Sequence, residues 1–183
     1  MTEPKLLLGG DEIDRTIKRM VEELHAKVVS PDDTVLVGIR THGVTLARRM
    51  HKLLALEYEW DLPLGILDTT LYRDDILQRD EQPMVRETNI EFDVTDKDVV
   101  LIDDVLYTGR TVRCALDAIM DLGRPRCILL VTLVDRGLRE LPIQPDVVGV
   151  EIETARDQIV EVHFTESERE DGVWVHSSSD SSP

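Results

Sequence analysis

The stretch that decides the fold is Val99-Val-Leu-Ile-Asp-Asp-Val-Leu-Tyr-Thr-Gly-Arg-Thr111. It opens with four apolar residues, which are typical of a parallel strand buried on both faces. Two carboxylates, Asp103 and Asp104, follow, and the turn at 108–111 opens a helix. Because ligands of open α/β sheets bind beyond the carboxyl ends of the strands, we expect a ligand site at this turn.

The turn itself suits a phosphate group. Free backbone N–H groups at a helix start attract an anion, with the helix dipole behind them. Gly109 lets the backbone approach closely, and the hydroxyls of Thr108 and Thr111 add donors. The paired carboxylates cannot bind an anion directly. They fit ribose hydroxyls, with a divalent cation nearby to screen their charge.

The pattern of the remaining chain predicts an α/β fold. A helix is expected over residues 11–28 with Asp11 as its N-cap, and the buried strand 34–39 leads through Arg40-Thr-His-Gly43 into a second helix. Further strands are expected at 64–71, 127–134, 147–148 and 159–164, and a third helix at 111–122. The long polar segment 72–97 is interpreted as a lid or a projecting arm. The alternation of strands and helices predicts a parallel sheet.

Length and composition favour one globular domain over residues 1–175, because 183 residues with 42% hydrophobic side chains can bury one core. The low-complexity segment 176–183 is expected to be a disordered tail. Cys114 and Cys127 lie in apolar patterns and are expected to be buried free thiols. With no stretch long enough to span a membrane, a cytoplasmic location is expected.

The net charge is −16, from 37 acidic and 21 basic side chains. A field of this sign repels nucleic acid and anionic membranes over most of the surface. A polyanionic ligand must therefore be held by a local device such as the turn at 108–111. Solubility alone is the other explanation of the charge.

The stretch 99–111 resembles the phosphoribosyl pyrophosphate (PRPP) motif of the phosphoribosyltransferases. As a whole the chain is similar to the PyrR family, pyrimidine operon regulators with uracil phosphoribosyltransferase activity. Three stretches support this over about residues 13–162: Leu36-Val-Gly-Ile-Arg-Thr-His-Gly43, Thr70-Leu-Tyr-Arg-Asp-Asp75 and Leu133-Val-Asp-Arg-Gly-Leu-Arg-Glu-Leu-Pro142. No GxGxxG or GxxxxGK(S/T) sequence supports a dinucleotide-binding or P-loop protein. The resemblance implies a type I phosphoribosyltransferase fold, with a mostly parallel central sheet flanked by helices, a flexible arm and a small base-covering hood.

The resemblance also implies the reaction of uracil with PRPP to give UMP and pyrophosphate. It assigns Asp103 and Asp104, the catalytic pair, to the ribose hydroxyls, and residues 107–111 to the 5′-phosphate. Magnesium would be held mainly by PRPP, without dedicated protein ligands. Purine-specific relatives carry a carboxylate at the position of Tyr107, so that general base is lacking here. The full phosphate- and ribose-binding segment is Asp103, Asp104, Val105, Leu106, Tyr107, Thr108, Gly109, Arg110 and Thr111.

Three weaker sites come from the same resemblance. It assigns Arg40 and Thr41 to the pyrophosphate, and Arg73 to the flexible arm. Taken alone, 40–41 is an ordinary polar turn and 73–75 a charged hairpin tip. The base-covering set is Asp135, Arg136 and the backbone of Val160. Taken alone, the first two residues of that set form an ion pair at a strand end.

PyrR proteins also bind pyr leader mRNA when uridine nucleotides, UMP or UTP, are present, which requires a basic face. Possible RNA contacts are Arg15, Lys18, Arg19, Lys27 and Arg139. Glu22 and Glu23 can pair with Lys18 and Arg19. RNA-binding relatives tend to carry basic or His residues where this chain has Glu22, Leu138, Gln144 and Val150. Aromatic content of 4% offers few platforms for base stacking.

Three functions therefore stay open. They are an enzyme, a uridine-nucleotide-dependent RNA regulator that shares its sites, and a catalytically silent nucleotide sensor. The resemblance also implies a homo-oligomer, either a dimer or a tetramer.

Overall fold

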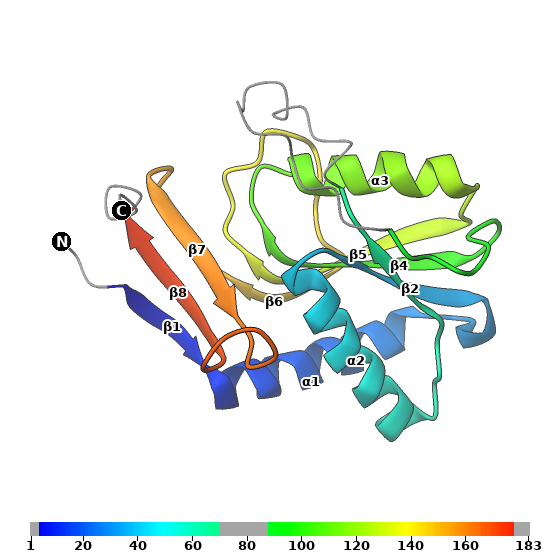
Figure 1. The fold of residues 1–183 in the computed structure, drawn as a ribbon, viewed down its shortest axis with the longest axis horizontal. Helices are drawn as coiled ribbons and strands as arrows, with labels where there is room; N and C mark the ends of the chain where they lie inside the picture. The colour runs from blue at the N-terminus through cyan, green and yellow to red at the C-terminus, as the bar shows by residue number, and fades with distance from the viewer. Residues whose placement is uncertain (1–3, 70–87, 178–183) are drawn as a thin grey trace.

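The computed structural model describes residues 4–69 and 88–177, which form two sheets and three α-helices. The larger sheet has five parallel strands in the order β3-β2-β4-β5-β6 (Figure 1). Its strands are β2 (Thr34–Ile39), β3 (Leu64–Leu67), β4 (Asp98–Leu106), β5 (Cys127–Asp135) and β6 (Val147–Glu151). The predicted α/β class with a parallel central sheet is confirmed.

Helices cover both faces of the larger sheet. Helices α1 (Gly10–Lys27) and α2 (His42–Tyr58) pack on one face, and α3 (Arg110–Leu122) lies on the other (Figure 1). A short 3₁₀ turn, η1 (Pro31–Asp33), precedes β2. Each face buries its own apolar cluster, so the central strand β4 is buried on both sides, as its continuous apolar run predicts.

The smaller sheet joins the two ends of the chain. It is antiparallel, in the order β1-β8-β7, so that strands from the first and the last part of the chain lie side by side (Figure 1). Its strands are β1 (Lys5–Gly9), β7 (Gln158–His163) and β8 (Gly172–Ser177). Strands β1 and β8 are not predicted from the sequence, because each pairs with a strand at the opposite end of the chain.

Several predicted boundaries are wrong. His176 and Ser177, assigned to a disordered tail, belong to β8 because they pair with β7. Helix α1 starts one residue earlier than predicted and its N-cap is Gly9, not Asp11; the Gly9 amide donates to the Glu12 carboxylate at 2.9 Å. Strand β3 ends at Leu67.

The two cysteines differ in their surroundings. Both are free thiols, but only Cys114 is buried, whereas Cys127, at the start of β5, is exposed. The predicted burial of Cys127 is therefore wrong, since the apolar pattern begins one residue later. None of the helices within residues 4–69 and 88–177 has the length and apolar content needed to cross a bilayer.

Candidate functional site

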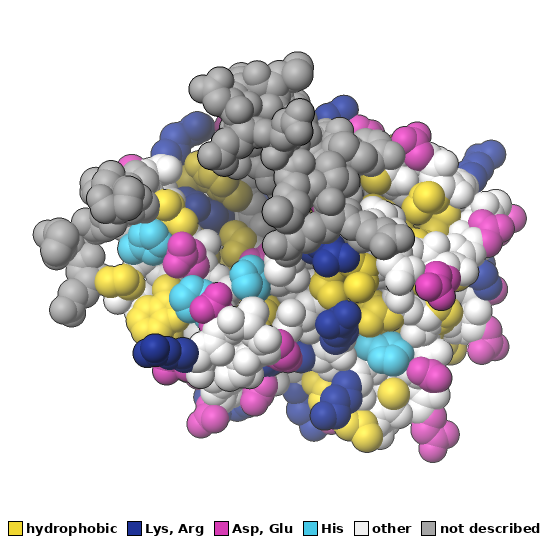
Figure 2. Space-filling view, in the orientation of Figure 1, with side chains coloured by type: hydrophobic (Ala, Val, Ile, Leu, Met, Phe, Trp, Pro, Cys, Tyr) yellow, Lys and Arg dark blue, Asp and Glu magenta, His cyan; other side chains and the backbone are white. Residues whose placement is uncertain are grey.

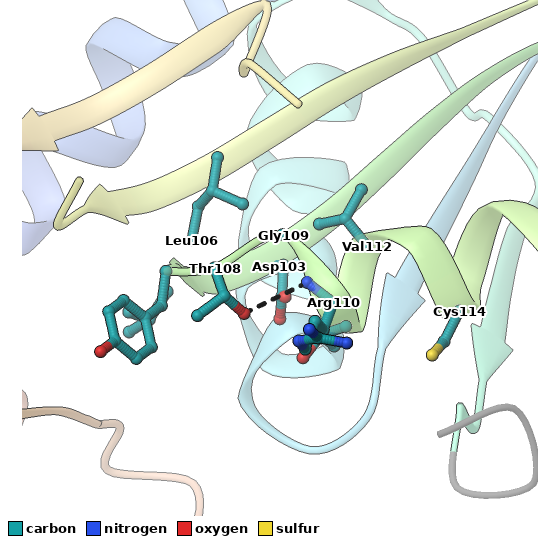
Figure 3. A pocket seen from close by; sticks show the side chains of 10 residues that line it. Asp103, Leu106, Thr108, Gly109, Arg110, Val112 and Cys114 are labelled. Carbon is teal, nitrogen blue, oxygen red and sulfur yellow. Dashed lines mark hydrogen bonds between the residues drawn. The ribbon is translucent and has the colours of Figure 1, made fainter. Parts of the chain in front are cut away.

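A cavity of about 250 Å³ opens at the carboxyl edge of the larger sheet (Figure 3). It collects the predicted phosphate- and ribose-binding segment except Asp104, because β4 delivers Asp103 and the following turn to one place. The residues that line it are Asp103, Val105, Leu106, Tyr107, Thr108, Gly109, Arg110, Thr111, Val112 and Cys114.

The turn at residues 107–111, called here the phosphate loop, has the geometry of an anion site. Gly109 is the N-cap of α3 with φ at 90°, a left-handed conformation that favours glycine. The first amides of a helix have no carbonyl partner within it. The Arg110 amide donates to the Thr108 hydroxyl oxygen at 3.4 Å, as the dashed line in Figure 3 shows. The loop therefore offers backbone and hydroxyl donors to one phosphate.

The two carboxylates differ, which the sequence does not reveal. Asp103 is only 5% exposed, whereas Asp104 is half-buried. One oxygen of the Asp103 carboxyl accepts a hydrogen bond from the Asp104 amide at 3.0 Å. Burial raises the pKa of Asp103 well above its ordinary value, and the adjacent Asp104 charge raises it further. Ionising Asp103 is therefore costly in the free protein, and a cationic or hydroxyl-rich ligand at this place would relieve the cost.

The predicted pyrophosphate residues lie at the same edge. Arg40 and Thr41 connect β2 to α2 through a cis peptide bond, and the Arg40 amide donates to the Leu67 carbonyl at 2.9 Å. A Cβ atom on Gly43 would lie 2.6 Å from the Ile102 carbonyl and 3.4 Å from Asp103 Oδ1. The start of α2 is therefore pressed against the end of β4, which brings residues 40–41 toward the two carboxylates.

A second loop, residues 137–143, lies over the phosphate loop and is called here the cover loop. The amides of Glu140 and Leu141 donate to the Thr108 carbonyl at 3.0 and 3.2 Å. Arg110 Nε donates to the Glu140 carboxylate at 2.8 Å. These contacts join two loops that lie far apart in the sequence, and they satisfy backbone groups of both.

Arg139 fastens the cover loop from inside. It donates to the carbonyls of Tyr107 and Ile143, each at 2.9 Å, and pairs with Asp135 at 2.5 Å. Its side chain is 13% exposed. The ion pair expected between Asp135 and its neighbour Arg136 is wrong, because Asp135 pairs with Arg139. The RNA contact predicted for Arg139 stays a prediction, and its side chain is held within this site.

Arg136 lies at the same strand end but has other partners. Its guanidinium stacks over the Tyr107 ring, 4.1 Å from the centroid. Nε donates to the Thr154 hydroxyl at 3.1 Å, and Nη2 donates to the carbonyls of Ala155 and Gln158 at 3.0 and 2.7 Å. Because Gln158 begins β7, Arg136 ties the phosphate loop to the smaller sheet. Val160, two residues further on, is buried in β7 and pairs with Val175.

Most of the other predicted RNA contacts are paired with carboxylates. Lys18 pairs with Glu57 at 2.9 Å, not with Glu22 as expected. Arg19 and Lys27 both pair with Glu23, at 3.6 and 3.8 Å. The expected pairing of Arg19 with Glu23 is confirmed. Figure 2 shows basic and acidic side chains interspersed over this face of the molecule.

Arg15, the remaining predicted RNA contact, lies at a groove. It lines a groove between α1 and α2 together with Lys18, Arg48 and Lys52. Arg73, assigned to the flexible arm, lies outside the described residues.

The donor set suits a shared magnesium ion better than a dedicated protein site. In the described part of the chain, no group of three or more His, Cys, Asp or Glu side chains converges. Asp103 and Asp104 supply two carboxylates, and magnesium commonly takes one or two carboxylates together with substrate phosphates. The residues therefore fit an ion that arrives with a phosphorylated substrate.

Comparison with known proteins agrees with this geometry. Residues 9–168 match the family model described as phosphoribosyl transferase domain. The chain is 46% identical over 174 residues to the bifunctional protein PyrR of Deinococcus radiodurans, covering 94% of this chain and 95% of that protein. It is 49% identical over 168 residues to the bifunctional protein PyrR of Thermus aquaticus, covering 91% and 92%.

Solved structures show the same fold at lower identity. A hypoxanthine phosphoribosyltransferase of Staphylococcus aureus is similar with a TM-score of 0.72 at 19% identity, covering 98% of this chain and 94% of that one. The hypoxanthine phosphoribosyltransferase of Trypanosoma cruzi gives 0.70 at 18%, covering 94% and 96%. These two likenesses concern the fold alone, and they confirm the predicted type I fold.

Proposed function

We propose, from the premise that this chain belongs to the phosphoribosyl transferase domain family and within it to the PyrR proteins, that it converts uracil and PRPP to UMP and pyrophosphate. One observation carries the proposal. The phosphate loop, the Asp103–Asp104 pair and the turn at 40–41 lie at the same edge of the larger sheet, because β2 and β4 are parallel neighbours. PRPP needs these three kinds of group for its 5′-phosphate, its ribose hydroxyls and its pyrophosphate.

The chemistry that these residues perform is mainly positioning. The N1 electron pair of uracil forms a bond to the anomeric carbon, and the bond from that carbon to pyrophosphate oxygen breaks with its electrons. The transition state has oxocarbenium character. Thr108, Thr111 and the first amides of α3 hold the 5′-phosphate, while Asp104 and Asp103 orient the ribose hydroxyls. Negative charge at Asp103 and Asp104 also favours the developing positive charge on the ribose.

Magnesium belongs to this proposal as the companion of PRPP. Asp103 and Asp104 are the residues that would face it, and it would neutralise pyrophosphate charge when bound. A cation at this position also relieves the cost of ionising the buried Asp103 carboxyl, whose pKa burial raises.

RNA-dependent regulation is the second function. The observation in its favour is that relatives 46% and 49% identical over nearly the whole chain are named bifunctional. We propose that pyr leader RNA binds with UMP or UTP as effector, but weakly, because Lys18, Arg19, Lys27 and Arg139 each already pair with a carboxylate. We also propose assembly into a dimer or tetramer. A cytoplasmic location suits the two free thiols.

The test is uracil-dependent release of pyrophosphate from PRPP with magnesium present. Activity in the parent chain and its loss in the Asp103→Asn, Asp104→Asn double variant, with the fold intact by circular dichroism, support the enzyme. Undiminished release in that variant would overturn the site assignment. UMP binding by calorimetry without any turnover would favour the nucleotide sensor.

A further inference from the structure

Two arginines near the end of β5 differ in whether a carboxylate neutralises their charge. Arg139 is neutralised by Asp135 at 2.5 Å. Arg136 is 6% exposed, yet it forms no ion pair with any carboxylate in residues 4–69 and 88–177. Asp135, its neighbour in the sequence, pairs with Arg139 instead. Arg136 is therefore a buried positive charge without a counter-charge.

The partners of Arg136 are all uncharged. They are the Thr154 hydroxyl, the carbonyls of Ala155 and Gln158, and the face of the Tyr107 ring. Nε and Nη2 make these hydrogen bonds, and Nη1 donates to no acceptor in the part of the chain that the structure describes. Burial lowers the pKa of Arg136, although a guanidinium keeps its proton in proteins. Holding an uncompensated charge out of water is costly, so a ligand that brings negative charge would recover that cost.

The guanidinium of Arg136 lies between two parts of the candidate site. Tyr107 lines the phosphate cavity, and Arg136 stacks on the Tyr107 ring. On its other side Arg136 is bonded to Gln158, the first residue of β7, two positions before Val160. The guanidinium thus lies where the phosphate loop meets the segment proposed to cover the base.

We propose that Arg136 stabilises the negative charge that uracil acquires when N1 loses its proton, so that the transfer proceeds without a general base on the protein. The inference rests on the proposed function. The N1 proton passes to solvent water, the N1 electron pair forms the bond to the anomeric carbon, and pyrophosphate leaves with the electrons of the broken bond. A guanidinium binds an anionic oxygen or nitrogen more strongly than a neutral one, and the difference grows in a water-poor site.

This role also accounts for Tyr107. An acid at that position would pair with Arg136 and cancel its charge. The aromatic ring instead holds the guanidinium through its face and leaves the charge available. The site would therefore replace a base that accepts the proton with a cation that makes the proton easier to lose.

The test compares two substrates in Arg136→Gln and Arg136→Lys variants. 5-Fluorouracil is nearly the same size as uracil but loses its proton more readily, because fluorine withdraws electrons. With Arg136→Gln we expect kcat/KM for uracil to fall on the order of 100-fold, as when one charge-stabilising donor is removed from an active site. The loss should be clearly smaller with 5-fluorouracil, and the uracil activity of the variant should recover as pH rises. Arg136→Lys, which keeps the charge, should retain more activity with uracil than Arg136→Gln.

Thr154→Val is the matched control, because it removes one anchor of Arg136 and leaves the charge in place. It should affect both bases by the same factor. Equal losses with both bases in Arg136→Gln, with no recovery at high pH, would overturn the role of the charge and leave only a structural one. A parent chain that is inert with PRPP and either base would instead overturn the proposed function, and this inference with it.

Discussion

Gly109 of the phosphate loop packs directly against Ile143 of the cover loop. A Cβ atom on Gly109 would lie 3.3 Å from Ile143 Cδ1, and the backbone at Gly109 has φ at 90°. The close approach lets the phosphate loop support the cover loop while keeping its amides directed at the cavity. Phosphate binding and cover-loop packing therefore depend on the same glycine.

Gly109→Ala is expected to weaken UMP binding about tenfold, which corresponds to about 1.4 kcal/mol. The added methyl group meets Ile143, and alanine in the left-handed region costs about 1 kcal/mol. Gly137→Ala is the matched control, because Gly137 also has a positive φ, 70°, but a methyl group added there would have no atom within 4 Å. Calorimetry with UMP decides between them. Equal losses in both variants would show that backbone strain alone matters and that the Gly109–Ile143 contact does not.

Asp103→Asn is expected to stabilise the free protein near neutral pH while it weakens PRPP binding. The folded state raises the pKa of Asp103 above its ordinary value of 3.8, so it holds that proton more tightly than the unfolded chain does. Stability must then fall as pH rises above that value, and the asparagine removes the effect. We expect Tm to rise by several degrees at neutral pH, a size common when a costly site residue is replaced.

Repeating the measurement at acidic pH tests whether the stability gain of Asp103→Asn comes from the ionisation of Asp103. Below the ordinary pKa, Asp103 is protonated in both states, so the advantage of Asp103→Asn should vanish. Asp104→Asn, at the half-buried neighbour, should change Tm less. Thermal melts of the three chains across the pH range give the result. A lower Tm for Asp103→Asn at neutral pH would show that the ionised carboxyl is satisfied in the free protein.

Thr111→Val is expected to weaken UMP binding by about 1–3 kcal/mol, the cost of leaving a charged acceptor short of one hydrogen bond. The side chains are close in shape, so the start of α3 should be kept. Titration calorimetry with UMP measures the change. An unchanged dissociation constant would mean that the phosphate does not contact this hydroxyl.

Arg49→Met should remove an acid-sensitive part of the stability by freeing the loop after β7 from its anchor on α2. Arg49 bonds Asp171 at 2.6 Å and Glu166 at 2.5 Å, and lies 4.7 Å from the centre of the Phe164 ring. These bonds lower the pKa of Asp171 and of Glu166. Lowered carboxyl pKa values add stability at neutral pH, and that stability is lost as pH falls through them.

We therefore expect Arg49→Met to lose about 2 kcal/mol at neutral pH, less than a fully buried pair would cost, because Glu166 is half exposed. The difference from the parent should shrink in acid. Denaturant titrations at neutral and acidic pH measure both values. A deficit that stays constant with pH would assign the loss to packing on Phe164.

Glu23→Gln is expected to tighten binding to pyr leader RNA more than Glu22→Gln does. Glu23 pairs with both Arg19 and Lys27, whereas Glu22 makes no ion pair within the described residues. Each additional phosphate contact steepens the slope of log affinity against log salt by about 0.7 on single strands. Filter binding at several salt concentrations measures affinity and slope. UMP affinity should not change, and strong, salt-insensitive binding by the parent would contradict the acidic-surface argument.

Sequence alone predicted the part of the site that is formed by one continuous segment of the chain. The strand, carboxylates, glycine turn and helix start between residues 99 and 111 act on their near neighbours, so their residue types suffice to predict their geometry. The parallel sheet follows for the same reason, since each strand–helix unit is marked by local apolar spacing. Strands β1 and β8 escaped because each is short and is stabilised only by the other end of the chain.

What the tertiary structure alone decided is which charge meets which. Asp135 and Arg136 are adjacent in sequence, yet Arg136 bonds to Thr154 and to the start of β7, and the cover loop brings Arg139 back to Asp135. The same packing buries Asp103 and leaves Asp104 half-exposed. Residue types fix which groups can ionise, but Coulomb and desolvation energies depend on distance and burial. These distances and this burial are set only when strand, loop and helix pack together.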